Sequence, residues 1–138
     1  MNPRIKTLLL HHREEPLRNV KAALERYSID TVRATTCGEA LSVLGRDNPP
    51  HVVLTDLTVS DSTWADALLL PTKSPVPVNL VVVSDVADLS LWRTAMECGA
   101  FKYITLPLPD SELRSLVQRA AENIAQRRGT ALRLAKTA

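Results

Sequence analysis

Short apolar segments of strand length alternate along this chain with segments whose apolar residues recur at helical spacing. The strand-like segments run from Ile5 to Leu10, Ile29 to Ala34, His51 to Thr55, Val78 to Val83 and Lys102 to Thr105. Each is followed by a stretch whose apolar positions are three or four residues apart, which predicts an amphipathic helix. The pattern therefore predicts five repeats of strand then helix.

The predicted helices differ in how clearly the sequence marks them. The first carries Leu17, Val20, Leu24 and Tyr27 after Pro16, the second spans Cys37 to Leu44 before Gly45, the third spans Trp64 to Leu70, and the fourth carries Leu89, Trp92, Ala95 and Met96. The fifth opens at Pro109 to Glu112 and has the clearest apolar stripe: Leu113, Leu116, Val117, Ala120, Ala121 and Ile124. Pro71, Pro75 and Pro77 are expected to keep the chain extended before the fourth strand.

This alternation predicts an α/β protein with a parallel sheet and helices on both faces. Right-handed crossovers favour a flavodoxin-like (βα)5 three-layer sandwich with five strands in the order 2-1-3-4-5. One domain is expected over residues 1–126, with a basic tail or linker over residues 127–138. The tail carries Arg127, Arg128, Arg133 and Lys136 with no acid. We interpret it as a solvated helix end, and a linker to an output domain stays open.

Composition narrows the classes of protein. Of the 138 residues, 45% are hydrophobic and 23% charged, which is typical of a soluble globular domain. A net charge of +2 gives no argument for nucleic-acid binding. The apolar runs are too short to span a bilayer and no signal peptide opens the chain, so a cytoplasmic location is expected. Cys37 and Cys98 match no metal-binding spacing, and we expect both to be reduced core residues.

Asp56 is the most informative residue for function, because it ends an apolar strand and precedes a polar loop. In open α/β sheets, ligands bind outside the carboxyl ends of the strands. There a carboxylate can be phosphorylated, hold a metal or pair with a cation. The residues expected at the same edge are His11 and His12 after the first strand, Ser84 after the fourth, and Leu106 with Pro107 after the fifth.

Over roughly Lys6 to Gln126, the chain resembles the receiver domain of two-component response regulators. The resemblance rests on the order of strands and helices, on Asp56-Leu57 after the third strand and on Ser84 at the end of the fourth. It also rests on the segment from Gly99 to Pro107, which is similar to the receiver pattern Gly-Ala-x-x-Tyr-x-x-Lys-Pro.

The resemblance implies a role for each matching residue. Asp56 is the candidate phospho-acceptor, and the backbone carbonyl of Thr58 would face a metal ion. Ser84 is the candidate hydroxyl for the phosphoryl group, and Tyr103 is the candidate switch aromatic. Pro107 is expected to follow a cis peptide bond.

The departures from the receiver pattern concern charge. His11 and His12 stand where receivers carry an acidic pair, and Leu106 stands where they carry a lysine. Glu14 and Glu15 come later, and a shifted loop would be needed to bring one of them near Asp56. Magnesium prefers oxygen ligands to imidazole. The lost lysine removes a charge pair whose Coulomb energy at ~4 Å is roughly 4 kcal/mol near a protein surface. Autophosphorylation should therefore be slowed by orders of magnitude.

No cofactor or metal is expected, and Mg²⁺ belongs only to the alternative in which the pocket works. A weaker alternative is a transition metal held by His11, Asp56 and Thr58. Protonated His11 or His12, or Arg13, would be another source of positive charge beside Asp56. Structural interpretations also stay open: Asp56 as a partly buried paired carboxylate, Ser84 as a helix cap, Tyr103 as a half-buried strand aromatic, and Trp92 with Met96 as packing residues.

We therefore expect a receiver-like regulatory module of phosphorelay signal transduction that acts through protein–protein interaction, with weak or no magnesium-dependent phosphorylation. It is not expected to be an enzyme, beyond self-catalysed phosphoryl transfer to Asp56 at most. The alternative is a functional receiver phosphorylated on Asp56 by a histidine kinase. A nucleotide or flavin binder is disfavoured because the chain lacks a glycine-rich phosphate loop.

The resemblance also implies the partners. They are a signalling protein or histidine kinase, with the alternative of a second copy bound through the face formed by the fourth helix, fifth strand and fifth helix. We expect Arg93, Lys102, Arg114 and Trp92 on that face. Neither membrane contact nor direct nucleic-acid binding by this domain is expected.

Overall fold

The computed structural model describes residues 4–13, 17–58 and 64–129. Its five parallel strands form one sheet in the order β2-β1-β3-β4-β5. The strands are β1 (Lys6–Leu10), β2 (Asp30–Ala34), β3 (Val52–Thr55), β4 (Asn79–Ser84) and β5 (Lys102–Thr105). The strand order predicted from the sequence is confirmed.

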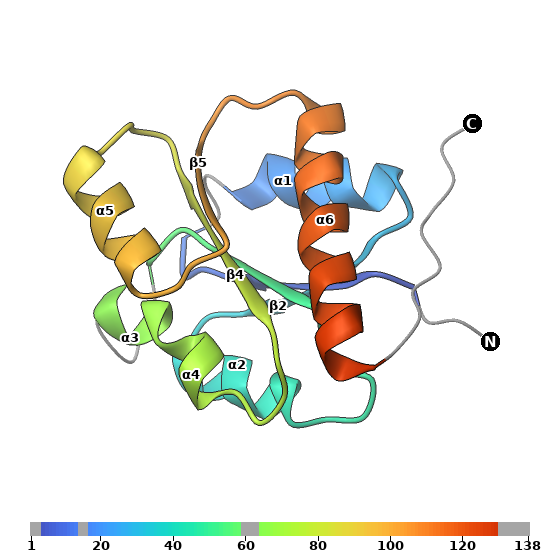
Figure 1. Cartoon of the computed structure of the whole chain (residues 1–138). Helices are drawn as coiled ribbons and strands as arrows, with labels where there is room; N and C mark the ends of the chain where they lie inside the picture. The colour runs from blue at the N-terminus through green and yellow to red at the C-terminus, as the bar shows by residue number, and fades with distance from the viewer. Residues whose placement is uncertain (1–3, 14–16, 59–63, 130–138) are drawn as a thin grey trace.

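Helices cover both faces of this sheet (Figure 1). They are α1 (Leu17–Arg26), α2 (Cys37–Leu44), α3 (Trp64–Leu68), α4 (Leu70–Lys73), α5 (Leu89–Glu97) and α6 (Asp110–Arg128). One core cluster packs α1 and α6 on the sheet, and the other packs α2, α3, α4 and α5 on the opposite face. Leu9 and Leu54 point into the first cluster, whereas Leu8 and Val53 point into the second. The central strands are mostly apolar because both of their faces are buried. No helix among the described residues is long and apolar enough to cross a membrane.

The prediction for the segment from Trp64 to Val78 was wrong in part. The predicted third helix is broken into α3 and α4, and Pro71 lies in the first turn of α4 instead of in extended chain. A proline is tolerated there because the first turn of a helix needs no backbone donor at that position. The extended conformation begins only at Ser74, where ψ is 138°.

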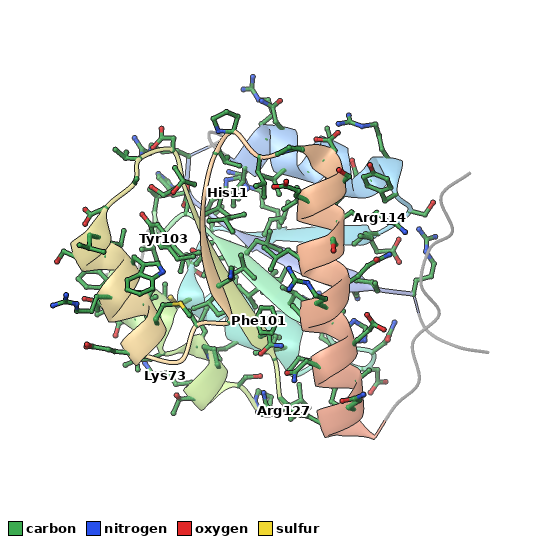
Figure 2. All side chains as sticks on the ribbon, turned by 45° about the horizontal axis from the view of Figure 1, so that its top comes forward. His11, Lys73, Phe101, Tyr103, Arg114 and Arg127 are labelled. Carbon is green, nitrogen blue, oxygen red and sulfur yellow. The ribbon has the colours of Figure 1, made fainter. Side chains whose placement is uncertain are left out.

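Three side chains lie elsewhere than the sequence suggested. Cys98 is an exposed free thiol because α5 ends at Glu97 and leaves it on the helix cap, whereas Cys37 is buried as predicted. Trp92 is 45% exposed, so it is not a packing residue, although Met96 packs on the core. The Arg114 guanidinium lies 5.2 Å from the ring centroid of Tyr27, on the α1 side of α6 and not on the predicted contact face (Figure 2).

The end of α6 is fixed to the amino edge of the sheet by Arg128. Its Nε donates to the Pro77 carbonyl at 2.8 Å, Nη1 to that of Pro49 at 3.1 Å and Nη2 to that of Pro50 at 2.7 Å. A guanidinium presents its donors in a rigid fork, which suits three carbonyls from two loops. The helix thus continues two residues past the domain end predicted at 126, and Gly129 ends it with a left-handed φ of 72°.

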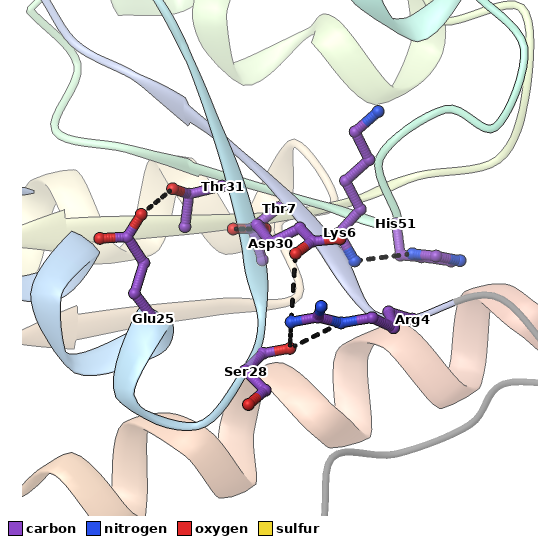
Figure 3. A network of polar contacts seen from close by, with 8 residues as sticks. All are labelled: Arg4, Lys6, Thr7, Glu25, Ser28, Asp30, Thr31 and His51. Carbon is purple, nitrogen blue, oxygen red and sulfur yellow. Dashed lines mark hydrogen bonds and ion pairs between the residues drawn. The ribbon is translucent and has the colours of Figure 1, made fainter.

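His51 lies near this arginine and is 3% exposed. Its Nδ1 accepts from the Lys6 backbone N–H at 3.2 Å (Figure 3). Burial, followed by the positive charge of Arg128, lowers the pKa of His51 to about 4. The same region contains the Arg4–Asp30 ion pair at 3.2 Å, which ties the start of β2 to the segment before β1 (Figure 3).

The burial of His51 predicts a pH dependence of stability. Its pKa is lowered from 6.5 to about 4 on folding. Between these two pKa values, His51 is protonated in the unfolded chain and neutral in the folded protein. Stability that is complete above pH 6.5 is lost as the pH falls toward 4. The loss from this one group reaches up to about 3 kcal/mol.

His51→Asn keeps a side-chain acceptor and removes the titration, so its free energy of unfolding should fall less steeply than that of the wild type across this window. Urea denaturation of both proteins at a series of pH values measures the difference, because the other titrating groups are shared. Parallel pH profiles would contradict this assignment.

Candidate functional site

The parallel register brings the candidate residues to one edge of the sheet. Leu10 pairs with Thr55, Thr55 with Val82, and Ser84 with Thr105. The strands β1, β3, β4 and β5 therefore end close together, and the residues that follow them lie at this carboxyl edge. Which of these side chains point toward one another depends on the loops.

Asp56 is half-buried and held by the turn that it begins. Its Oδ1 accepts from the backbone N–H of Thr58 at 2.9 Å and from the Thr58 hydroxyl at 2.6 Å. Leu57 between them has a left-handed φ of 70°, a conformation that non-glycine residues rarely adopt. Asp56 Oδ2 is buried and has no hydrogen-bond partner among the described residues. An unsatisfied buried acceptor costs about 1–3 kcal/mol. Native proteins keep few such atoms, and one of them marks this carboxylate as a candidate functional group.

The two histidines after β1 point to different surroundings. His11 is 4% exposed, and its ring Nδ1 bonds to the Arg13 carbonyl. His11 lines a cavity between α1 and β2, together with Leu9 and Arg33. His12 is exposed, and its backbone N–H donates to the Thr58 carbonyl at 2.6 Å. The carbonyl that the resemblance assigns to a metal ion is thus already bonded to the end of β1.

Ser84 and Tyr103 meet at one backbone atom. The Ser84 hydroxyl donates to the Val86 carbonyl at 2.9 Å and accepts from the Val86 N–H at 3.1 Å. The Tyr103 hydroxyl donates to the same carbonyl at 3.1 Å. Ser84 therefore closes a local turn and does not cap the helix that follows. Asp88 caps α5 instead, with its Oδ1 accepting from the Leu91 N–H at 2.9 Å.

The Leu106 side chain lines a different cavity from Asp56, although the Leu106 backbone N–H donates to the Ser84 carbonyl at 2.8 Å. The peptide bond between Leu106 and Pro107 is cis, as predicted. Leu106 packs against the core cluster under α1 and α6, and with Pro107 it lines a cavity of about 460 Å³ beside those helices. An aliphatic side chain can be buried there, whereas a lysine would have to carry its ammonium group toward water or an acid.

The structure therefore brings together Asp56 and Ser84, which line one cavity of about 440 Å³ between the strand ends, α3 and α5. His11 and Leu106 line other cavities. Sequence reasoning missed several further lining residues, among them Trp64 and Asp88. Asp88 had a usable signal, since an aspartate directly before a helical apolar pattern predicts an N-cap, but Trp64 had none.

Within residues 4–13, 17–58 and 64–129, no group of three or more histidine, cysteine, aspartate or glutamate side chains is placed to hold a metal ion. Glu14, Glu15 and Pro16, together with Arg133 and Lys136 of the tail, lie outside the described residues. The predicted roles of Asp56, Ser84 and Tyr103 in phosphoryl chemistry stay predictions.

Comparisons with known proteins point to the same fold. No model of a protein family matches the chain. Over 111 residues the chain is 24% identical to the transcriptional regulatory protein FixJ of Rhizobium meliloti (strain 1021), which covers 80% of this chain and 54% of FixJ. The chain thus spans about half the length of this curated relative.

Among solved structures, a response regulator receiver domain protein from Clostridium thermocellum superposes with a TM-score of 0.71 at 24% identity, covering 86% of this chain and 95% of that one. The non-phosphorylated HemR receiver domain of Leptospira biflexa gives 0.67 at 23% identity over 86% and 94%. A two-component response regulator from Clostridium difficile gives 0.71 at 18% identity over 86% and 97%. The chain therefore has the fold of response regulator receiver domains, which confirms the resemblance predicted from the sequence.

The turn at Asp56 can be tested by Thr58→Val. The substitution keeps the branched shape and removes the hydroxyl that donates to Asp56 Oδ1. We expect the free energy of unfolding to fall by about 1–2 kcal/mol, because the acceptor is charged and partly buried. Urea denaturation measures the change. Thr94→Val is the matched control, since its hydroxyl bonds only to an exposed helix carbonyl. Equal losses in both variants would contradict a special role for the Thr58 hydroxyl.

Proposed function

We propose that this chain is a receiver-like regulatory module of two-component signal transduction that acts through protein–protein contact, with weak or no magnesium-dependent phosphorylation. One observation carries the proposal. The only charged side chains that line the Asp56 cavity, within the described residues, are the carboxylates of Asp56 and Asp88. A phosphoryl group added there would meet negative charge without a nearby cation to offset it.

The chemistry of phosphoryl transfer supports this view. Catalysis of that reaction consists mostly of positioning and of neutralising charge on the transferred group. Here Asp56 Oδ1 is bonded to Thr58, and the Thr58 carbonyl accepts from His12. Leu106 packs under α1 and α6. The fold that would position a phosphoryl group is present, but the position of the cation that would neutralise it is taken by Leu106.

The proposed partner surface is the face formed by α5, β5 and α6. Leu89 is 71% exposed and Trp92 is 45% exposed on α5, and Arg93 and Lys102 are exposed beside them. Large exposed apolar side chains flanked by charge are typical of contact surfaces. We propose a signalling protein, a histidine kinase or a second copy as the partner. The proposal includes a cytoplasmic location and no nucleic-acid contact by this domain.

A second candidate function is a working phospho-acceptor, phosphorylated on Asp56 by a histidine kinase. The placement of Asp56 and Ser84 on one cavity favours it, since an acceptor and its partner hydroxyl need such proximity. Under this alternative Mg²⁺ would be required, and the chain would catalyse at most its own phosphorylation.

Beryllofluoride, which mimics a phosphoryl group on aspartate, separates the two functions. With magnesium and beryllofluoride, we expect no saturable amide shifts at Asp56, Ser84 or Tyr103, because no cation offsets the added negative charge. Two-dimensional ¹H–¹⁵N spectra measure this. Asp56→Asn and beryllofluoride without magnesium are the controls. Saturable shifts that Asp56→Asn abolishes would establish the working acceptor and overturn our proposal.

The reverse experiment restores charge to the pocket. In the double variant His11→Asp with Leu106→Lys, we expect magnesium binding to return in part, because the new carboxylate next to the end of β1 supplies an oxygen ligand, whereas the lysine would serve a phosphoryl group and not the metal. Calorimetric titration with MgCl₂ compares the double variant with each single variant and the wild type. A thermal melt checks that both buried positions accept the change. If the wild type binds magnesium measurably and as tightly as the double variant does, the proposal that the native pocket is missing its charged groups is contradicted.

A further inference from the structure

A basic cavity lies between α1 and β2, separate from the cavity at Asp56. It encloses about 250 Å³, and Arg18 and Lys21 of α1, Arg33 of β2 and His11 after β1 are among its lining residues. No aspartate or glutamate lines it within the described part of the chain. A small enclosed space with cations on two sides and no lining acid is suited to an anion.

The fold brings these cations together from two elements. Arg18 and Lys21 lie one turn apart and so share a side of α1. Arg33 is the register partner of Leu9, which places it on the face of the sheet that α1 covers. Its Nη2 donates to the His12 carbonyl at 3.1 Å, which holds the guanidinium beside the end of β1. A guanidinium carries several donors, so it can serve an anion in addition to this carbonyl.

His11 supplies a second, independent indication. It is 4% exposed, and its Nδ1 carries a proton because it faces the Arg13 carbonyl, which can only accept. Nε2 has no hydrogen-bond partner among the described residues. It is also not one of their fully enclosed unpartnered polar atoms, of which Asp56 Oδ2 is the single example, so Nε2 stays reachable. A protonated imidazole would donate from this atom to a bound anion.

The opposite end of the cavity is marked by an acid. Glu25 of α1 accepts from the hydroxyl of Thr31, a lining residue, at 3.3 Å (Figure 3). Thr31 precedes Arg33 along β2, so Glu25 lies toward the amino edge of the sheet and the cations lie toward the carboxyl edge. An anion is therefore expected at the end of the cavity that His11 and Arg33 line, away from Glu25.

We propose that this cavity binds a small tetrahedral oxyanion, either inorganic phosphate or the phosphoryl end of a small phosphomonoester. The anion accepts from His11 Nε2 and lies in the field of Arg18, Lys21 and Arg33. Its oxygens point in several directions and suit donors that arrive from both α1 and β2, whereas a halide or a planar carboxylate would meet fewer of them. The site is independent of phosphoryl chemistry at Asp56, which lines a different cavity.

Sodium sulfate, sodium phosphate and methyl phosphate are the probes, and NaCl at equal ionic strength is the control for screening. In ¹H–¹⁵N titrations of the full chain, we expect saturable shifts at Lys21, Thr31 and Arg33 with the oxyanions and not with chloride. The melting temperature should rise with their concentration, because they bind the folded state. Tighter binding of methyl phosphate would assign the site to an ester, and tighter binding of phosphate to the free ion. Absent shifts, or equal shifts with chloride, would overturn the proposal.

Four variants localise the anion. Lys21→Gln should lower the sulfate affinity about twofold to fivefold. Lys102→Gln is its matched control, since it removes the same charge from the opposite edge of the sheet and should change nothing. Glu25→Gln should raise the affinity about twofold, because it removes the acid at the far end of the cavity. His11→Asn keeps a donor for the Arg13 carbonyl and removes Nε2, so the affinity should fall at least about tenfold.

Equal affinities of Lys21→Gln and Lys102→Gln for sulfate would overturn the proposal, because they would reduce binding to general surface charge. This comparison of two exposed positions also decides if His11→Asn fails to fold. Sulfate shifts centred on Asp56 and Ser84 would place the anion in the other cavity and likewise overturn it. Saturable beryllofluoride shifts at Asp56 would refute the proposed function and leave the oxyanion site standing.

The role of His11 has its own readout. Sulfate keeps its double charge across the range, so its affinity should be higher at about pH 6 than at about pH 8, where fewer histidines donate from both nitrogens. Arg18 and Lys21 on α1 and Arg33 on β2 face His11, and such side chains stay charged at both values. The difference should vanish in His11→Asn. Equal sulfate affinity of the wild type at both pH values would overturn the assignment of His11 Nε2 as a donor to the anion.

Discussion

The parallel register of β1, β3 and β4 is the constraint on which the rest of the structure depends. Because both faces of these strands are buried, their interiors hold mainly apolar side chains and contain no charged residue, and the charged chemistry lies just beyond their carboxyl ends. The register aligns those ends, so Asp56 and Ser84 come to one cavity without any direct bond between them. The positions of α3 and α5 follow, since each helix continues from a strand end and returns over the same face of the sheet.

The two edges of the sheet differ in how well their polar groups are hydrogen-bonded. At the amino edge, Arg128 satisfies three backbone carbonyls, and the neighbouring His51 stays neutral because burial holds its pKa at about 4. At the carboxyl edge, Asp56 keeps one buried oxygen without a partner among the described residues. The first arrangement stabilises the end of α6, whereas the second lowers stability. The polar groups described at the amino edge are hydrogen-bonded, whereas a buried carboxylate oxygen at the carboxyl edge is not. This difference places the candidate site at the carboxyl edge.

Features that depend on local pattern were predicted correctly from the sequence. Features that depend on a tertiary contact, or on the residue at which a helix ends, were not. Strand order, the amphipathic stripe of α6, the cis bond before Pro107 and the placement of Asp56 with Ser84 all followed from periodicity or from the receiver resemblance. The exposure of Cys98 could not be predicted, because it depends on α5 ending at Glu97. The stacking of Arg114 on Tyr27 and the anchoring of Arg128 join residues far apart in the chain, and a charged residue on a helix gives no sign of such a partner.

The replacement of a lysine by Leu106 bears on how such a module works. A buried leucine contributes about 1.5–3 kcal/mol through removal of its surface from water, and Leu106 contributes part of this by packing under α1 and α6. The fold is thus compatible with the loss of the cation, because the same position serves the core. What changes is the field at Asp56, which becomes that of two carboxylates with no opposing side-chain charge in the described lining. Two carboxylates repel a further negative charge, and this repulsion is the physical basis for the proposal that the module works with weak or no phosphorylation.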